Sequence, residues 1–326
     1  CKVMTKKPEL LLPVGNIEMC QAAIHNGANA IYVGMPEFNA RGRTTDHSFD
    51  QLEEIINLCH TYNVKVHVAF NIVIFEQEIE RAVELIKKLI PLSPDAIIVQ
   101  DLGLVKLIKE IAPWQTIHAS TQMTITNELA IDLTKDLDIE RYVLGRENSL
   151  DEIKQIKENT NKELEVFVHG ALCVAYSGQC FTSESIGGRS ANRGQCAQSC
   201  RFEYDLIVDD KKVDLIDQKY LVSPQDLCGI DEVGKLRELG VDSLKVEGRL
   251  KSPLFVASVA NSYRAAIDDQ ASTKELKEEM AITYSRGFFP GWLHGVNHQD
   301  LVDGTFGSNR GLKIGQIQEV RKNSLI

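Results

Sequence analysis

The sequence lacks the features that mark membrane-spanning and exported proteins. Its 326 residues contain no apolar run of about 18 residues, the length that a membrane helix requires. The N-terminal segment also lacks the charged and then apolar layout of a secretory signal. With 43% hydrophobic and 25% charged residues, the composition is typical of a soluble globular protein. We therefore expect a cytoplasmic protein with no membrane partner.

Cysteine is scarce for a disulfide-stabilised protein, and several common enzyme motifs are missing. Eight cysteines in 326 residues are too few for a disulfide scaffold. No H-E-x-x-H, G-x-S-x-G or C-x2-C motif occurs, which argues against common hydrolases and zinc ribbons. The net charge of −10 argues against nucleic-acid binding that depends on charge alone. A local basic site remains open, because Arg189, Arg193 and Arg201 occur in a stretch without acidic residues. These three arginines are the candidates for a contact with nucleic acid at such a site.

The cysteines that are present gather in one segment. Cys173, Cys180, Cys196 and Cys200 lie among glycines and small polar residues, and Cys228 follows. Packing does not explain this crowding, whereas thiolates that converge on a soft metal centre do. The spacing C-x6-C-x15-C-x3-C-x27-C suits an iron–sulfur cluster, because the cluster itself spans irregularly spaced ligands. Structural zinc and redox-active thiols are the alternatives. Five cysteines compete for four ligand positions.

Short apolar runs alternate with stretches of helical periodicity along most of the chain. There are eight such runs, at residues 9–13, 30–34, 65–70, 96–100, 116–120, 141–145, 165–170 and 243–248. This alternation predicts parallel βα units, and their number favours a closed (β/α)8 TIM-like barrel over an open sheet. We expect the barrel to occupy residues 1–270, with a Cys-rich insertion at 171–228 after the seventh strand. Within the insertion, a hairpin is expected to turn at Asp209 and Asp210.

The pattern changes after the eighth unit. We expect a polar helix and the start of a small C-terminal β module in residues 271–326, where glycine and aromatic residues are frequent. Because the sequence ends within the start of this β module, we expect it to belong to a longer chain.

Polar side chains occur where the predicted strands end. In a barrel, these ends line one mouth, which is where active sites form. The expected substrate-binding residues are Arg41, Arg43, Asn71, His118, Gln122, Arg146 and Arg249, and the catalytic candidates are His169 and Glu247. Any one of these side chains could instead satisfy loop backbone groups. As a set, they predict a pocket for a small anion.

Long motifs connect these features to a known family. The segments FVHGALCVAYSGQC and GRSANRGQCAQSCR, followed by QDLC and KVEGRLKS, resemble the collagenase-like peptidase U32 family. The resemblance extends from ELLLPVG to YSRGF and so covers nearly the whole chain. It is strongest to the branch that hydroxylates a cytidine of the large-subunit (23S) ribosomal RNA to 5-hydroxycytidine. A sister branch hydroxylates the wobble uridine of transfer RNA, and another, acting as a pair, hydroxylates a ubiquinone precursor.

The resemblance implies a function and a cofactor. It implies an oxygen-independent RNA hydroxylase with a four-iron, four-sulfur (4Fe-4S) cluster, and prephenate as the source of the hydroxyl group. Arg41, Arg43, Arg146 and Arg249 would suit such a small dicarboxylate. The implied ligands are Cys173, Cys180 and Cys196, with the fourth position open between Cys200 and Cys228. A second subunit is left open as a partner.

Two other functions compete with RNA hydroxylation. The first is peptide hydrolysis, for which Cys173 or Cys180 with His169 would have to act as nucleophile and base. The second is a non-catalytic role, in which the cluster is a structural staple or redox sensor on an RNA- or partner-binding platform. The ring of polar strand ends favours an enzyme, because a scaffold needs no such pocket.

Overall fold

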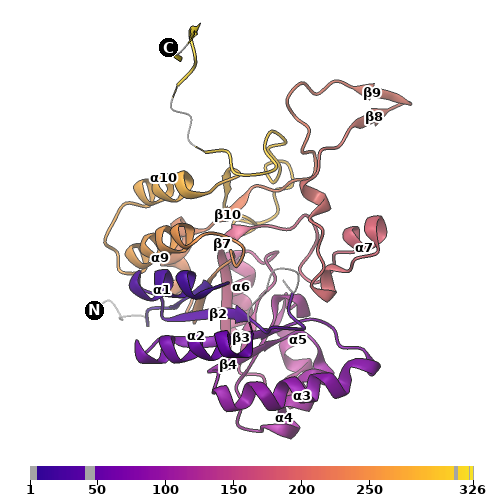
Figure 1. Cartoon of the computed structure of the whole chain (residues 1–326), viewed down its shortest axis with the longest axis vertical. Helices are drawn as coiled ribbons and strands as arrows, with labels where there is room; N and C mark the ends of the chain where they lie inside the picture. The colour runs from indigo at the N-terminus through magenta and orange to yellow at the C-terminus, as the bar shows by residue number, and fades with distance from the viewer. Residues whose placement is uncertain (1–5, 41–47, 312–314, 323, 326) are drawn as a thin grey trace.

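Eight parallel strands form a closed barrel at the centre of the protein (Figure 1). The computed structural model describes residues 6–40, 48–311, 315–322, 324 and 325. The barrel strands are β1 (Glu9–Pro13), β2 (Ala30–Gly34), β3 (Lys65–Phe70), β4 (Ala96–Val99), β5 (Ile117–Ala119), β6 (Arg141–Val143), β7 (Glu163–Ala171) and β11 (Ser243–Val246). They pair in chain order, and β11 closes the barrel by pairing with both β7 and β1. The predicted TIM-like barrel is thereby confirmed, with all eight apolar runs as its strands.

The barrel strands form where the sequence is apolar on both faces. Strands β2 and β4 are buried along their whole length, as expected for parallel strands covered by helices. The surrounding helices are α1 (Ile17–His25), α2 (Phe49–Thr61), α3 (Ile79–Leu89), α4 (Leu102–Ile111), α5 (Glu128–Leu133), α6 (Leu150–Glu158), α8 (Val233–Glu238) and α9 (Pro253–Ile267). Their starts carry standard capping signals. Ser48 and Gln51 form a capping box on α2, and Ser252 caps α9 just before Pro253.

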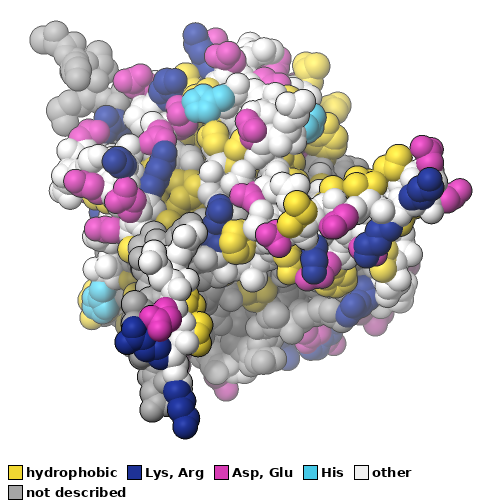
Figure 2. Space-filling view, turned by 90° about the horizontal axis from the view of Figure 1, so that it is seen from above, with side chains coloured by type: hydrophobic (Ala, Val, Ile, Leu, Met, Phe, Trp, Pro, Cys, Tyr) yellow, Lys and Arg dark blue, Asp and Glu magenta, His cyan; other side chains and the backbone are white. Residues whose placement is uncertain are grey.

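The Cys-rich insertion (residues 171–228) separates β7 from α8. It contains α7 (Thr182–Gly187), the hairpin strands β8 (Leu206–Val208) and β9 (Lys211–Val213), and β10 (Asp226–Cys228). The predicted turn at Asp209 and Asp210 is confirmed, because both residues have the positive φ of a tight hairpin turn. Figure 2 shows hydrophobic side chains along this projecting hairpin, with charged ones at its tip. Strand β10 returns to the barrel and pairs antiparallel with the end of β7.

The chain after α9 returns to the barrel. Helix α10 (Thr273–Thr283) buries Leu276 and Met280 in the main core. Strand β12 (Phe288–Phe289) pairs with β10, while β13 (Val320–Arg321) and β14 (Ser324–Leu325) form a separate two-stranded sheet. The proposed domain division at residue 270 stays a prediction. Within the described ranges, no helix has the length and apolarity needed to cross a bilayer.

Candidate active site

A cavity of about 140 Å³, partly open to solvent, lies where the strand ends meet the Cys-rich insertion. We call it the mouth cavity. It brings together five of the predicted substrate-binding and catalytic residues, and these are Asn71 after β3, Gln122 after β5, Arg146 after β6, and Glu247 and Arg249 after β11. Arg41 and Arg43 lie outside the described residues. The cavity thus lies at the end of the barrel where enzymes of this fold carry their active sites.

Hydrogen bonds fix the polar wall of the mouth cavity. Arg146 forms an ion pair with Glu247, with 3.2 Å between Nη2 and Oε2, and its guanidinium stacks over the Phe167 ring at 3.9 Å. Asn71 accepts a hydrogen bond from the Ala40 amide at 3.0 Å. Arg249 donates to Asn39 Oδ1 at 3.4 Å. The wall therefore holds two guanidinium groups and a carboxylate in a largely buried setting, where they interact more strongly than in water.

Four thiols line the same cavity. Cys173, Cys180, Cys196 and Cys200 all border it, and none of them is in a disulfide. We call these four residues the thiol set. Burial raises the pKa of Cys200, Arg201 lowers it, and the other three thiols raise it further by repulsion. Each of the other three sulfurs is therefore close enough to Cys200 to disfavour its thiolate form. A metal centre bound by them would remove their protons, as soft thiolate sites require.

Cys228 lies apart from the thiol set. It ends β10, is 4% exposed, and belongs to the main hydrophobic core next to Tyr263. Burial raises its pKa to about 11. Since Cys228 does not line the mouth cavity, the structure brings together only four of the five predicted ligand cysteines.

The loop that carries Cys173 and Cys180 is tied to the barrel mouth. Thr124 donates a hydrogen bond to the Ser177 carbonyl at 2.7 Å, and the Arg146 amide donates to Ser177 Oγ at 3.2 Å. Gly178 has a φ of 73°, and a Cβ at this position would collide with the Gln122 carbonyl oxygen. Only glycine fits this close approach without strain. The thiols are therefore held against the strand ends by the local backbone.

Two of the three predicted RNA-contacting arginines are used inside the protein. Arg193 pairs with Glu78, and its guanidinium lies 4.6 Å from the Phe75 ring. Arg201 donates to the Leu172 carbonyl and to Ser223 Oγ, both at 2.8 Å. Arg193 thus fastens the insertion to the barrel, whereas Arg201 connects two parts of the insertion to each other. Arg189 is half-buried; its amide donates to the Ser183 carbonyl at 3.4 Å, and its side chain makes no hydrogen bond or ion pair within the described part of the chain.

His169 faces away from the mouth cavity. It is buried among aromatic rings, with Tyr263 and Phe288 each at 5.5 Å between ring centroids. The register between β7 and β11 shifts just before this residue, so that Phe167 pairs with Lys245 but His169 pairs with Val246. A β-bulge of this kind turns the following side chain to the other face of the sheet. His169 was predicted to line the mouth because it ends the seventh strand, and the bulge changes this direction; burial lowers the pKa of His169 to about 4.

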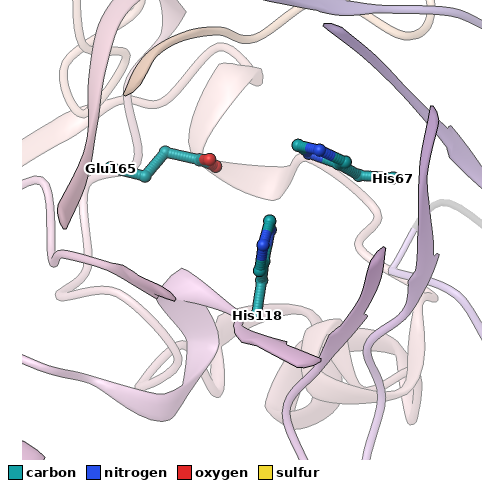
Figure 3. Close-up of side chains that lie close together, drawn as sticks. All are labelled: His67, His118 and Glu165. Carbon is teal, nitrogen blue, oxygen red and sulfur yellow. The ribbon is translucent and has the colours of Figure 1, made fainter. Parts of the chain in front are cut away.

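His118 lies inside the barrel, one layer below the cavity. Ser120, two residues later on the same side, lines the cavity, whereas His118 is 2% exposed. Figure 3 shows that His118, His67 and Glu165 point toward one another, and their ligand-type atoms lie within 4.8 Å. Burial lowers the pKa of both histidines, that of His67 to about 4, so both imidazoles are neutral.

The Glu165 carboxylate already has two cationic partners. It accepts hydrogen bonds from Lys245 Nζ at 2.7 Å and from Arg141 Nη1 at 3.1 Å. Burial opposes its ionisation, but Lys245 and Arg141 outweigh that effect and hold the pKa at about 2. These groups form a charge network in the barrel interior, to which Glu9 and Glu163 also contribute through Arg141.

Lys245 was missed by the sequence interpretation. It is 4% exposed, its Nζ lies 4.6 Å from the Tyr32 ring centroid, and it lines the mouth cavity. The signal was a lysine inside the run SLKVEG, a predicted barrel strand. A charged residue within a strand covered on its outer face by helices has to point into the barrel.

The three buried histidines make stability depend on pH. Unfolded histidines titrate near pH 6.5, whereas the pKa values of folded His67 and His169 are about 4 and that of His118 is also well below 6.5. Between these values the unfolded chain binds more protons, so stability must fall as the pH drops from 6.5 toward 4. We expect a slope of up to about 4 kcal/mol per pH unit near pH 5. Urea unfolding at several pH values measures it.

The variant His169→Asn provides the control for this slope. It removes one of the three groups and should lower the slope by about 1.4 kcal/mol per pH unit. An unchanged slope in this variant would show that His169 is already protonated in the folded protein.

Comparison with known proteins gives consistent matches. The model of peptidase family U32 matches residues 15–303. The chain is 38% identical over 279 residues to "tRNA hydroxylation protein P1" of Bacillus subtilis, a match that covers 84% of this chain and 66% of that protein. It is 35% identical over 335 residues to "23S rRNA 5-hydroxycytidine C2501 synthase" of Escherichia coli, covering 99% of this chain and 50% of that protein.

The chain therefore spans about two thirds of the first relative and half of the second. Among solved structures, a U32 peptidase superposes with a TM-score of 0.51 at 14% identity, covering 76% of this chain and 96% of that chain. This last match concerns the fold alone.

Proposed function

Since the chain belongs to peptidase family U32, we propose that it hydroxylates a pyrimidine base of RNA without molecular oxygen, using an iron–sulfur cluster. The product is a 5-hydroxypyrimidine, with 5-hydroxycytidine in 23S ribosomal RNA as the first candidate. The observation that carries the proposal is the position of the thiol set on the wall of the mouth cavity, beside a polar site for a small anion. The names of the two relatives support RNA as the substrate class.

The thiol set fits a four-iron, four-sulfur cluster in donor type and number. Four thiols from one insertion border one cavity, and the one carboxylate on the same wall, Glu247, is already paired with Arg146. We propose Cys173, Cys180, Cys196 and Cys200 as the ligands. With all four irons held by thiolates, such a cluster would supply electron transfer. The protein's part is to hold the thiolates and to keep the cavity largely closed to water.

The polar wall is proposed to bind the hydroxyl donor, a small dicarboxylate such as prephenate. Arg146 and Arg249 offer guanidinium groups that match carboxylates, and Lys245 adds a cation at the cavity floor. Glu247 is the one predicted catalytic residue that lines the cavity, and it already pairs with Arg146. A bound carboxylate would share Arg146 with Glu247, which leaves the Glu247 carboxylate available to accept a proton.

The geometry gives no support to peptide hydrolysis by a Cys–His pair. His169, the histidine next to the Cys-rich insertion, faces α9 and does not line the mouth cavity. Among the described residues, no histidine lines the cavity that contains the thiol set. A nucleophile and base need hydrogen-bond reach, and His169 does not share the cavity with Cys173 or Cys180.

Deletion of the gene tests the proposed function. Cells without the protein should lose one 5-hydroxypyrimidine from ribosomal or transfer RNA, as seen by mass spectrometry of RNA digests. The full-length gene should restore it.

In vitro, Arg146→Gln should raise the prephenate concentration for half-maximal rate by about tenfold or more, because a guanidinium–carboxylate contact is lost. Unchanged RNA in the deletion strain, or peptide cleavage by cluster-free protein, would overturn the proposal.

A further inference from the structure

A second hollow lies beside the mouth cavity and is walled by aromatic side chains. This groove of about 150 Å³ shares part of its lining with the mouth cavity, including Arg146, Cys173 and Tyr176. The rings of Tyr176, Trp292 and His298 line it. We call this hollow the aromatic groove and these three residues its aromatic residues. They come from two distant parts of the chain, because Tyr176 belongs to the Cys-rich insertion and the other two follow β12.

We propose that the aromatic groove binds an unpaired base of the RNA substrate and presents it to the thiol set. This inference rests on the proposed function and adds to it the site at which RNA enters. Proteins recognise single-stranded RNA by stacking unpaired bases on aromatic rings, and each such contact contributes about 1–3 kcal/mol. The groove offers aromatic faces next to a thiol of the thiol set.

The arrangement of the rings suits a flat ligand. The Tyr176 and Trp292 ring centroids are 5.6 Å apart with an interplanar angle of 87°, and those of Trp292 and His298 are 5.4 Å apart at 85°. Both outer rings therefore stand at near right angles to the indole, and neither is stacked parallel on it. Tyr176 is 57% exposed, an unusual position for a tyrosine that packing alone would place.

The base of the groove is rigid. Trp292 is half-buried and packs against the small core cluster that contains Leu172 and Leu301. The Leu150 amide donates to the Leu293 carbonyl at 3.0 Å, and the Gln225 amide donates to the Leu301 carbonyl at 2.9 Å. Figure 1 shows this C-terminal chain running beside β10 and the insertion, as the pairing of β12 with β10 requires. Trp292 is thus a fixed platform that needs little ordering on binding.

The position of Tyr176 links the groove to the chemistry. It lies between Cys173 and Cys180, and the segment around it borders both the groove and the mouth cavity. A base on Tyr176 would approach the thiol set from outside, while a small carboxylate in the barrel would approach it from below.

The two tryptophans of the chain allow a direct test. Trp114 is 73% exposed and precedes β5, at the opposite end of the barrel from the thiol set. In Trp114→Phe protein, Trp292 is the only indole fluorophore. We expect a single-stranded oligocytidine of about ten nucleotides, within the span of one single-strand site, to quench this fluorescence saturably. Trp292→Phe protein, which retains Trp114, should show no quenching. A duplex RNA of the same length should have little effect, because its bases are already stacked.

Affinity gives the second measurement. Tyr176→Ala should raise the Kd for the same oligonucleotide about 5- to 100-fold, the equivalent of one lost stacking contact. Its iron and sulfide content should stay at the wild-type value, which separates base binding from an effect on the thiol set. Because Tyr176 is largely exposed, this variant is expected to fold.

The outcomes separate this inference from the proposed function. Quenching of Trp292 without any hydroxylated product would support the RNA site and count against the hydroxylase. Hydroxylation by Tyr176→Ala and Trp292→Phe proteins with an unchanged KM for RNA would overturn the RNA site and leave the hydroxylase standing. Quenching by a collagen-like peptide but not by RNA would also overturn it, in favour of a peptide groove.

Discussion

Cys200→Ala protein prepared without oxygen is expected to contain no four-iron cluster, whereas Cys228→Ala protein is expected to retain about four irons and four sulfides per chain. The reason is position. Cys200 borders the mouth cavity with the other members of the thiol set, while Cys228 is packed in the main core beside Tyr263. Iron and sulfide quantitation with an optical spectrum measures both variants. RNA hydroxylation should be lost in Cys200→Ala and kept in Cys228→Ala.

Cys228→Ala is also the matched control, because it removes a thiol from the same region without touching the cavity. Truncating a buried cysteine should cost stability of about 1–2 kcal/mol and no iron. If Cys228→Ala instead lost the cluster and Cys200→Ala kept it, β10 would have to leave β7 to deliver its thiol. Stoichiometric zinc in wild-type protein, or no metal under strict anaerobiosis, would refute the cluster itself.

Glu165→Gln is expected to lower the free energy of unfolding by about 3–5 kcal/mol, the usual cost of breaking a buried ion pair. Glu165 is fully buried and bridges Lys245 and Arg141. Arg141 keeps Glu9 and Glu163 as partners, but Lys245 loses the only carboxylate with which it forms an ion pair among the described residues. An uncompensated ammonium then remains in the barrel interior. Urea unfolding of variant and wild type gives the difference.

Two further variants test the cause of this loss. The double variant Glu165→Gln with Lys245→Met should recover part of the stability, because the unpaired cation is removed as well. Glu158→Gln breaks a surface pair with Lys154, whose side chain is 57% exposed, and should change stability by less than about 0.5 kcal/mol. If the double variant were as unstable as Glu165→Gln, packing rather than charge would explain the loss.

The sequence alone was sufficient for the barrel and for the segment that carries the thiols. The eight runs of strand-forming residues are local signals, because each strand is apolar over its own length whatever its partners are. The hairpin turn at Asp209 and Asp210 is local in the same way. Crowding of cysteines among small residues can also be read directly from the sequence. A thiol site could therefore be predicted before any tertiary contact was known.

Tertiary structure decided which side chains share the cavity. A bulge between β7 and β11, visible only when the strands pair, turns His169 away from the mouth. Arg193 and Arg201 find partners in Glu78 and in carbonyl groups far along the chain, which no spacing rule predicts. Cys200 and Cys228 are equivalent candidates in the sequence, yet the pairing of β10 with β7 places Cys228 in the core.

The difference between what the sequence predicts and what only the tertiary structure decides has one physical reason. Periodicity, turn chemistry and cysteine crowding are set by residues a few positions apart, and a single chain displays them. The direction of a side chain at a strand end, and the partner that neutralises a buried charge, depend on which strands pair and in what register. The sequence therefore determined the barrel and the thiol-bearing insertion, and only the folded chain selected Cys200, Lys245 and Glu247 for the cavity and excluded His169.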